Sequence, residues 1–314
     1  MKLIFMGTPD FAVPSLQCVA KSGHELVGVV TRPDVPRGRG RGRMPPEVKV
    51  AAQDLGVPIL QPASLKDPAF LEALRNLDAD LFVVVAFLIL PKAVLAIPKQ
   101  GSVNLHPSLL PKYRGAAPIQ WAVIRGETET GITIFQLSPR VDAGDMLLQE
   151  KVAIGSEETA GELYERMKEM GASWLVKAID GIANRTVVPV AQSDEGVTRA
   201  PKLDKEDGRI DWSKDAERVR NLIRGTNPSP GAFTRWQGQS LKVHRAAVVD
   251  GSGEPGVVIE VGGKAGPVVA TGKGALSLAE VQPPGKKRMS GTDFVRGYPI
   301  GVGDRLGNGA GEGV

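Results

Sequence analysis

Residues 81–87 read Leu81-Phe82-Val83-Val84-Val85-Ala86-Phe87, a continuous apolar run. Two shorter runs of the same kind precede it, at residues 3–6 and 26–30. A strand that is covered on both faces of a parallel sheet carries such an uninterrupted run, because neither face meets water. The three runs therefore predict buried strands of one parallel sheet.

Segments with apolar residues at helical spacing separate or follow these runs, and they are residues 11–21, 46–55 and 68–77. Alternating strands and helices build β-α-β units, so we predict a doubly wound α/β domain with a Rossmann-like, mostly parallel sheet. Two more strand-like runs, at residues 131–137 and 146–154, precede a helix from residue 159 to about 181 that is expected to close this domain.

The sequence changes in character near residue 182, where helical spacing is lost and Pro189 and Pro201 interrupt the chain. A helical segment near residues 216–224 follows, and then short strand-like runs separated by Gly, Pro and Asp predict a small, OB-like β-barrel. These runs are residues 231–236, 240–249, 256–261, 267–271 and 276–281. We predict domains at residues 1–188 and 206–314 with a linker at 189–205, and we expect the Gly-rich stretch from Gly301 to fray.

Composition narrows the class of protein. The 314 residues carry a formal net charge of +4, which permits a polyanionic partner without requiring one. Cys18 is the only cysteine and the three histidines lack ligand spacing, so neither a disulfide nor a metal is expected. The longest apolar stretch, residues 81–90, is short of the ~20 residues of a membrane span, and no leader pattern precedes Leu3. We expect a cytoplasmic protein without a membrane partner.

The most informative polar residues are Asn104 and His106 in the segment Ser102-Val103-Asn104-Leu105-His106. If this segment is a strand, both side chains point to the same face at its carboxyl end, where ligands of open α/β sheets bind. An amide can donate a hydrogen bond to an oxyanion, and an imidazole can also exchange a proton near neutral pH. The pair is a candidate catalytic site, although an isolated pair is more simply a hydrogen-bonded histidine beside a turn.

A competing site is Gly7-Thr8-Pro9-Asp10, since a glycine turn before a helix can hold phosphate. The G-x-G-x-x-G pattern is missing, however, and Pro9 has no backbone donor. A dinucleotide site, and with it a dehydrogenase, is therefore disfavoured.

The stretch from Asn104 to Pro111 resembles the folate-dependent formyltransferase family, in which Asn-x-His at a strand end precedes a Ser-Leu-Leu-Pro turn. The resemblance implies a third catalytic residue, an aspartate before a glycine on a later loop, and Val141-Asp142-Ala143-Gly144-Asp145 occupies that place. Asp142 is then expected to be the carboxylate partner of His106. The residues themselves do not distinguish Asp142 from Asp145, since an aspartate in a turn is commonly turn chemistry.

The likeness covers almost the whole chain and is closest to the family members that act on methionyl-tRNA. Matching segments are residues 5–12, 83–86, 88–91, 114–119, 129–133 and 209–212. The resemblance implies transfer of the formyl group of 10-formyltetrahydrofolate to the α-amino group of initiator methionyl-tRNA, in a bacterial cytoplasm. It also implies a folate site formed by Leu88, Ile89, Leu90, Ser108, Leu109, Leu110, Pro111 and Val141.

Arginine alternates with glycine at Arg37, Arg39, Arg41 and Arg43. Four arginines in seven residues predict a flexible RNA-binding arm with little structure of its own, because guanidinium groups pair with phosphates and stack on bases. The resemblance implies that this arm enters the acceptor end of tRNA.

A second basic cluster lies in the predicted barrel domain. By itself it favours a solvated turn, but the resemblance implies a tRNA-binding domain there, so we expect it to contact RNA. The cluster consists of Lys286, Lys287 and Arg288.

Two alternative functions remain open. The same catalytic residues could serve a small amine acceptor, as in family members that act on glycinamide ribotide or amino sugars, but the arginine arm and the barrel domain argue against it. A non-catalytic tRNA-binding protein need not keep Asn104, His106 and Asp142. No segment predicts self-association, so a monomer is expected.

Overall fold

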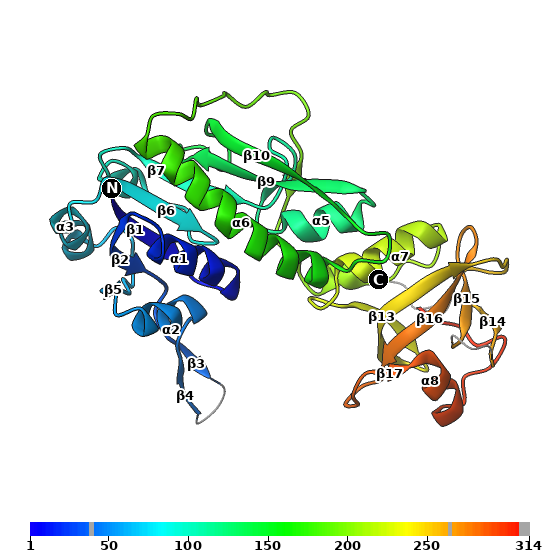
Figure 1. Cartoon of the computed structure of the whole chain (residues 1–314). Coiled ribbons are helices and arrows are strands. Elements are labelled where there is room, and N and C mark those ends of the chain that lie inside the picture. The colour runs from blue at the N-terminus through cyan, green and yellow to red at the C-terminus, as the bar shows by residue number, and fades with distance from the viewer. Residues whose placement is uncertain (38–40, 263–265, 308–314) are drawn as a thin grey trace. The chain divides into compact units, whose positions relative to one another are not determined.

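The computed structural model describes residues 1–37, 41–262 and 266–307 (Figure 1), and for Arg37, Arg41 and Gly42 it describes only the backbone. The chain divides into two compact units. The first comprises Met1–Pro118, Glu129–Ala153 and Tyr164–Ala200, and the second comprises Ile119–Thr128, Ile154–Leu163 and the chain from Pro201 onward. The domain bounds expected from the sequence stay a prediction, but most of the expected linker, up to Ala200, packs with the first unit.

A seven-stranded sheet forms the centre of the first unit, with strand order β10-β9-β7-β6-β1-β2-β5. The strands from β7 to β5 in this order pair in parallel, whereas β7 pairs antiparallel with β9 and β9 with β10. The bounds are β1 Lys2–Gly7, β2 Glu25–Val30, β5 Ile59–Leu60, β6 Leu81–Val85, β7 Ser102–His106, β9 Glu129–Gln136 and β10 Met146–Ala153. The predicted mostly parallel sheet is confirmed, and all five residues of β6 are buried.

Helices cover this sheet because their apolar faces must be removed from water. Helix α1 and the long helix α6 lie over one face (Figure 1), and Gly171 of α6 leaves room for Leu105 of β7. Helix α3 starts where the Asp67 carboxylate accepts the Ala69 N–H, with Pro68 in the first turn. The bounds are α1 Val13–Ala20, α2 Glu47–Asp54, α3 Pro68–Asn76, α4 Lys92–Leu95 and α6 Ala160–Ala183; helix α5 (Pro118–Ile124) belongs, from Ile119 onward, to the second unit. Among the described residues, no helix is both long enough and apolar enough to cross a membrane.

The arginine-glycine arm is more ordered at its base than the sequence indicates. Strand β3 (Val35–Arg37) pairs antiparallel with β4 (Arg41–Met44), and Val35 lies opposite Met44. The expectation of little structure is therefore wrong for the two ends of the arm, because pairing satisfies their backbone groups. Residues 38–40, which include Arg39, lie outside the described residues.

The second unit is built on an antiparallel sheet with strand order β12-β13-β16-β15-β14 and with β17 added beside β16. Gln237 and Gly238, both at positive φ, form the tight turn between β12 and β13. Trp212, Val243 and Phe294 belong to the core of this unit. The bounds are α7 Ala216–Gly225, β12 Ala232–Trp236, β13 Gln239–Val249, β14 Val258–Glu260, β15 Val268–Ala270, β16 Ala275–Gln282, β17 Met289–Ser290 and α8 Gly291–Gly297.

The segment from Asp304 to Gly307 bridges the two ends of this sheet. Its carbonyl at Asp304 accepts the Val258 N–H beside β14 at 2.8 Å, and its N–H at Gly307 donates to the Arg235 carbonyl of β12 at 2.8 Å. The sheet is thereby closed as in the small barrel that the sequence predicts. The expectation that the chain frays from Gly301 is wrong as far as Gly307, because these backbone groups are hydrogen-bonded and Leu306 is buried.

Candidate active site

Asn104 and His106 lie at the carboxyl end of β7, between β6 and β9. Asn104 is partly exposed, and none of the described residues forms a hydrogen bond with its amide side chain. His106 is only 4% exposed and lies opposite Thr133 of β9. The strand end therefore combines an available amide with a nearly buried imidazole.

The hydrogen bonds of His106 fix where its proton lies. Nε2 is 2.9 Å from the Tyr113 carbonyl oxygen, which can only accept, so Nε2 carries the hydrogen of the neutral ring. Nδ1 then has an available lone pair, and it lies 3.9 Å from Oδ2 of Asp142. Burial lowers the pKa of His106, and the opposing effects of the Asp142 charge and the Tyr113 carbonyl do not reverse this. The ring is neutral at neutral pH, with Nδ1 ready to accept a proton.

The structure distinguishes the two aspartates that the sequence left open. Asp142 is the one next to His106, and its Oδ2 also accepts the Gly115 N–H at 2.8 Å. Asp145 is exposed, and its backbone carbonyl accepts the Gln136 N–H. Gly144 lets this loop approach β9, because a Cβ there would lie 1.7 Å from the Gln136 carbonyl oxygen.

The site is supported by three residues that the sequence analysis did not identify. Tyr113 and Gly115 act through backbone atoms, as acceptor for His106 and donor to Asp142, so their side chains gave no signal. The third, Thr133, ties down the turn after His106, since it donates to the Ser108 carbonyl and accepts the Leu110 N–H. Its position opposite His106 could be recognised only once the register of β7 and β9 was known.

The expected folate residues fall into three groups by exposure. Leu88, Ile89 and Val141 present exposed apolar side chains, and Ile89 is 75% exposed. Leu109 and Pro111 are partly exposed. Leu90, Ser108 and Leu110 are buried, and the Ser108 hydroxyl donates to the Lys112 carbonyl. Because β6 and β7 are neighbours, the loop with Leu88 and Ile89 begins beside the strand that carries His106.

The two basic clusters belong to different units. Arg43 is exposed on β4, while only the backbone is described for Arg37 and Arg41. The second cluster is exposed on the turn between β16 and β17 in the second unit, and it consists of Lys286, Lys287 and Arg288.

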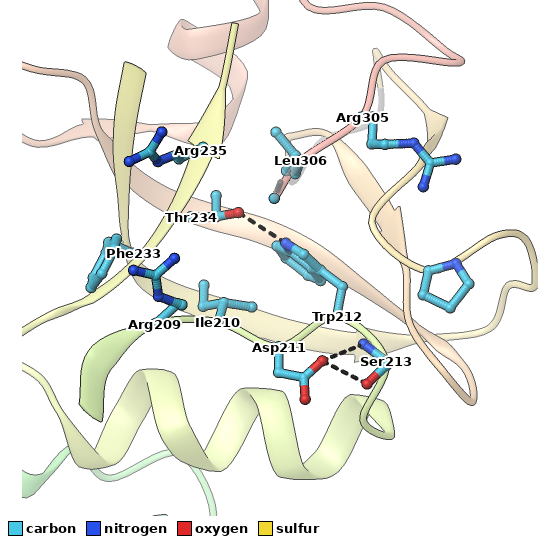
Figure 2. Close-up of a pocket in the computed structure, with 12 residues that line it drawn as sticks. Arg209, Ile210, Asp211, Trp212, Ser213, Phe233, Thr234, Arg235, Arg305 and Leu306 are labelled. Atoms are coloured by element: carbon cyan, nitrogen blue, oxygen red, sulfur yellow. Dashed lines mark hydrogen bonds between the residues drawn. The ribbon is translucent and has the colours of Figure 1, made fainter. Parts of the chain in front are cut away.

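A pocket of about 460 Å³ lies in the second unit, with Arg209, Arg235 and Arg305 among its lining residues (Figure 2). Trp212 forms part of its wall and donates from Nε1 to the Thr234 hydroxyl. Glu206 pairs with Arg209, and Glu254 pairs with Arg305. The expected catalytic residues do not line this pocket, and we assign it no role.

Comparison with known families defines the class of protein. A model described as formyl transferase matches residues 1–179, and a model of the formyl transferase C-terminal domain matches residues 202–299. The chain belongs to the formyl transferase family.

Relatives within this family are methionyl-tRNA formyltransferases. The enzyme of Moorella thermoacetica is 49% identical over 310 residues, covering 98% of this chain and 99% of that protein. The enzyme of Citrifermentans bemidjiense is 46% identical over 308 residues, covering 98% of this chain and 96% of that protein. The resemblance found in the sequence is confirmed.

Solved structures share the fold at low sequence identity. An N-formyltransferase from Helicobacter canadensis, in complex with folinic acid and dTDP-3-aminofucose, has a TM-score of 0.68 and 18% identity over 92% of this chain and all of its own. HypX from Aquifex aeolicus in complex with tetrahydrofolic acid has a TM-score of 0.64 and 19% identity, covering 96% of this chain and 48% of its own. These two confirm the fold.

Proposed function

We propose that the chain transfers the formyl group of 10-formyltetrahydrofolate to the α-amino group of methionine on initiator tRNA, giving formylmethionyl-tRNA. The observation that carries this proposal is the arrangement of Asn104, His106 and Asp142 at the carboxyl end of the sheet. Relatives that are methionyl-tRNA formyltransferases over nearly their whole length support the acceptor. Folate compounds bound to proteins of the same fold support the donor.

The reaction requires a nucleophilic amine and a stabilised oxyanion. The neutral α-amine attacks the formyl carbon, a C–N bond forms, and negative charge develops on the formyl oxygen. Asn104 donates a hydrogen bond to that oxygen, which stabilises the tetrahedral intermediate. A ligand reaches the nearly buried His106 from the side where Asn104 and Asp142 are partly exposed.

Proton movement is the task of His106. Nδ1 accepts the proton that the attacking amine releases, because Nε2–H is bonded to the Tyr113 carbonyl. The Asp142 carboxylate stabilises the imidazolium that results. Protonated Nδ1 can then donate to the oxyanion and pass its proton to the folate nitrogen, whose bond to the formyl carbon breaks.

The test uses purified protein, labelled 10-formyltetrahydrofolate and three acceptors: methionyl initiator tRNA, free methionine and glycinamide ribotide. We expect label on methionyl-tRNA alone. Asn104→Ala and His106→Ala should each lower kcat by about 10²–10⁴-fold, since each removes a hydrogen-bonding or proton-transfer group of the transition state. Thermal melting should show that both variants fold.

The control is His24→Ala, a histidine that contacts Asp180 and the N-terminal amine instead of the candidate site. Its kcat should equal that of the wild type. A near-wild-type rate for His106→Ala would refute the catalytic assignment, and label on glycinamide ribotide in place of methionyl-tRNA would refute the acceptor.

A further inference from the structure

Residues 190–200, which we call the strap, are more than a connection between domains. Val190 and Met146 exchange two backbone hydrogen bonds, of 2.8 and 2.9 Å. At the other end of the strap, Arg199–Ala200 (β11) pairs in parallel with Arg114–Gly115 (β8). The strap is therefore bonded both to the chain that follows the Asp142 loop and to the turn that contacts His106 and Asp142.

One side chain of the strap, Gln192, joins these two regions. Its Nε2 donates to the backbone carbonyls of Asp142, at 2.9 Å, and Gly144, at 2.8 Å. Its Oε1 accepts from Arg114, at 3.1 Å from Nε and 2.7 Å from Nη2. The orientation of the amide is fixed by its partners, because carbonyls only accept and a guanidinium only donates.

These bonds complete a ring of contacts around Asp142. Its carboxylate is held by the Gly115 N–H, and its backbone is held through Gln192 to Arg114, the residue before Gly115. Asp142 has a φ of +48°, a left-handed conformation that is unfavourable for a residue with a side chain. These contacts from outside the loop hold it in the conformation that points the carboxylate toward His106.

The strap also holds the partner of His106. The Thr198 hydroxyl accepts the Tyr113 N–H at 2.8 Å, and the Thr198 carbonyl accepts the Arg114 N–H at 2.9 Å. Tyr113 in turn accepts the Nε2 hydrogen of His106. Both halves of the His106–Asp142 pair are thus supported by the same segment.

We propose that Gln192 is a positioning residue for formyl transfer, which holds the Asp142 loop so that the carboxylate faces Nδ1 of His106. It does not touch the reacting atoms; it acts through Asp142. The role rests on the proposed function, because a positioned imidazole–carboxylate pair matters for a reaction that moves a proton at Nδ1.

The test compares Gln192→Ala with Gln192→Glu, which keeps the size of the side chain and an acceptor for Arg114 but puts an oxygen against the two carbonyls. We expect kcat to fall by about 10–100-fold in both, as for a misplacement of about 1 Å in a catalytic group, with little change in KM for either substrate. In Gln192→Ala, which adds no charge, the acid limb of the rate profile should also move to lower pH, since the Asp142 charge raises the pKa of His106 and its displacement removes that effect.

Nitrogen-15 NMR gives a readout independent of catalysis, because the chain has only three histidines. The Nδ1 titration of His106 should move to lower pH in Gln192→Ala, which adds no charge near the ring. The matched control is Ser193→Ala, which removes a strap hydrogen bond to the Glu195 N–H and leaves the Asp142 loop untouched. It should keep the kcat, the acid limb and the His106 titration of the wild type.

The measurements of kcat and of the His106 titration decide whether Gln192 is a positioning residue. An unchanged kcat, or a lower kcat with an unmoved His106 titration, would overturn the positioning role, because Asp142 would still face the ring. Thermal melting identifies a variant that does not fold, and the other variant then carries the test. A wild-type protein that formylates no acceptor would refute the proposed function instead, while the NMR comparison would still report whether Gln192 sets the His106–Asp142 geometry.

Discussion

The chemistry of the site depends on which nitrogen of His106 carries the proton. The Tyr113 carbonyl holds the hydrogen on Nε2, and this leaves Nδ1 facing the Asp142 carboxylate. Burial, which lowers the pKa of the ring, keeps it neutral until a proton arrives. A neutral ring next to a carboxylate is suited to accept a proton in the reaction and to be stabilised once it has done so.

The residue-scale prediction concerns pH. The acid limb of kcat/KM should lie below the ordinary histidine pKa of 6.5, because the folded ring resists protonation. In Asp142→Asn the limb should move still lower, since the charge that raises the pKa of His106 is lost. Initial rates across pH at tRNA concentrations well below KM would measure both effects, because these rates are proportional to kcat/KM.

The same pKa shift has a consequence for stability with a definite sign. The unfolded chain protonates His106 first as the pH falls, so the native state should lose stability below about pH 6.5.

For the kinetic prediction, an acid limb of kcat/KM above pH 6.5, or one that does not move in Asp142→Asn, would contradict the proton-acceptor role of Nδ1.

At the scale of elements, regular helices and buried strands lie close to where periodicity predicts them. Residues 68–77 were expected to be helical and α3 spans Pro68–Asn76, because a proline and a capping aspartate mark its start in the sequence. The hairpin of β3 and β4 was missed, since its pairing is short and its arginines and glycines do not alternate with apolar residues.

This hairpin carries the element-scale prediction. Replacing Arg37, Arg39, Arg41 and Arg43 together by alanine should raise KM for methionyl-tRNA and leave KM for the folate unchanged. The slope of the logarithm of the tRNA association constant against the logarithm of the salt concentration should also become less steep. The change should be roughly 0.7–0.9 for each phosphate contact that is lost, because fewer counterions are released. Filter binding across a salt series measures the slope.

The control for the arm is Arg75→Ala, an exposed arginine in the last turn of α3. It should keep the wild-type KM and salt slope. Equal slopes for the wild type and the fourfold variant would rule out the arm as an RNA contact.

At the scale of the whole molecule, the second unit includes chain from well before the predicted linker. Ile119–Thr128 and Ile154–Leu163 both belong to it. Arg224 of α7, only 8% exposed, donates to the backbone carbonyls of Gly155 and Glu158. A contiguous C-terminal fragment would therefore lack part of its own framework.

The whole-molecule prediction follows from this arginine. Arg224→Met should lower the free energy of unfolding by about 2–3 kcal/mol, because two inward carbonyls lose their donor. Arg218→Met on the same helix is the control, since the Arg218 side chain is 75% exposed, and it should change the free energy by less than about 0.5 kcal/mol. Urea denaturation measures the free energy of unfolding of both variants. Equal losses in the two would show that the buried Arg224 contacts do not contribute to stability.

The sequence by itself determined the alternation of strands and helices, the strand end with Asn104 and His106, and the family. These depend on local periodicity and on motifs whose residues lie a few positions apart. Only the tertiary structure decided that Asp142 and not Asp145 faces His106, that Gln192 and Thr198 support the site, and that Asp304–Gly307 closes the barrel. Those contacts join segments far apart in the chain, largely through backbone groups that every residue possesses, so residue identity alone carries no sign of them.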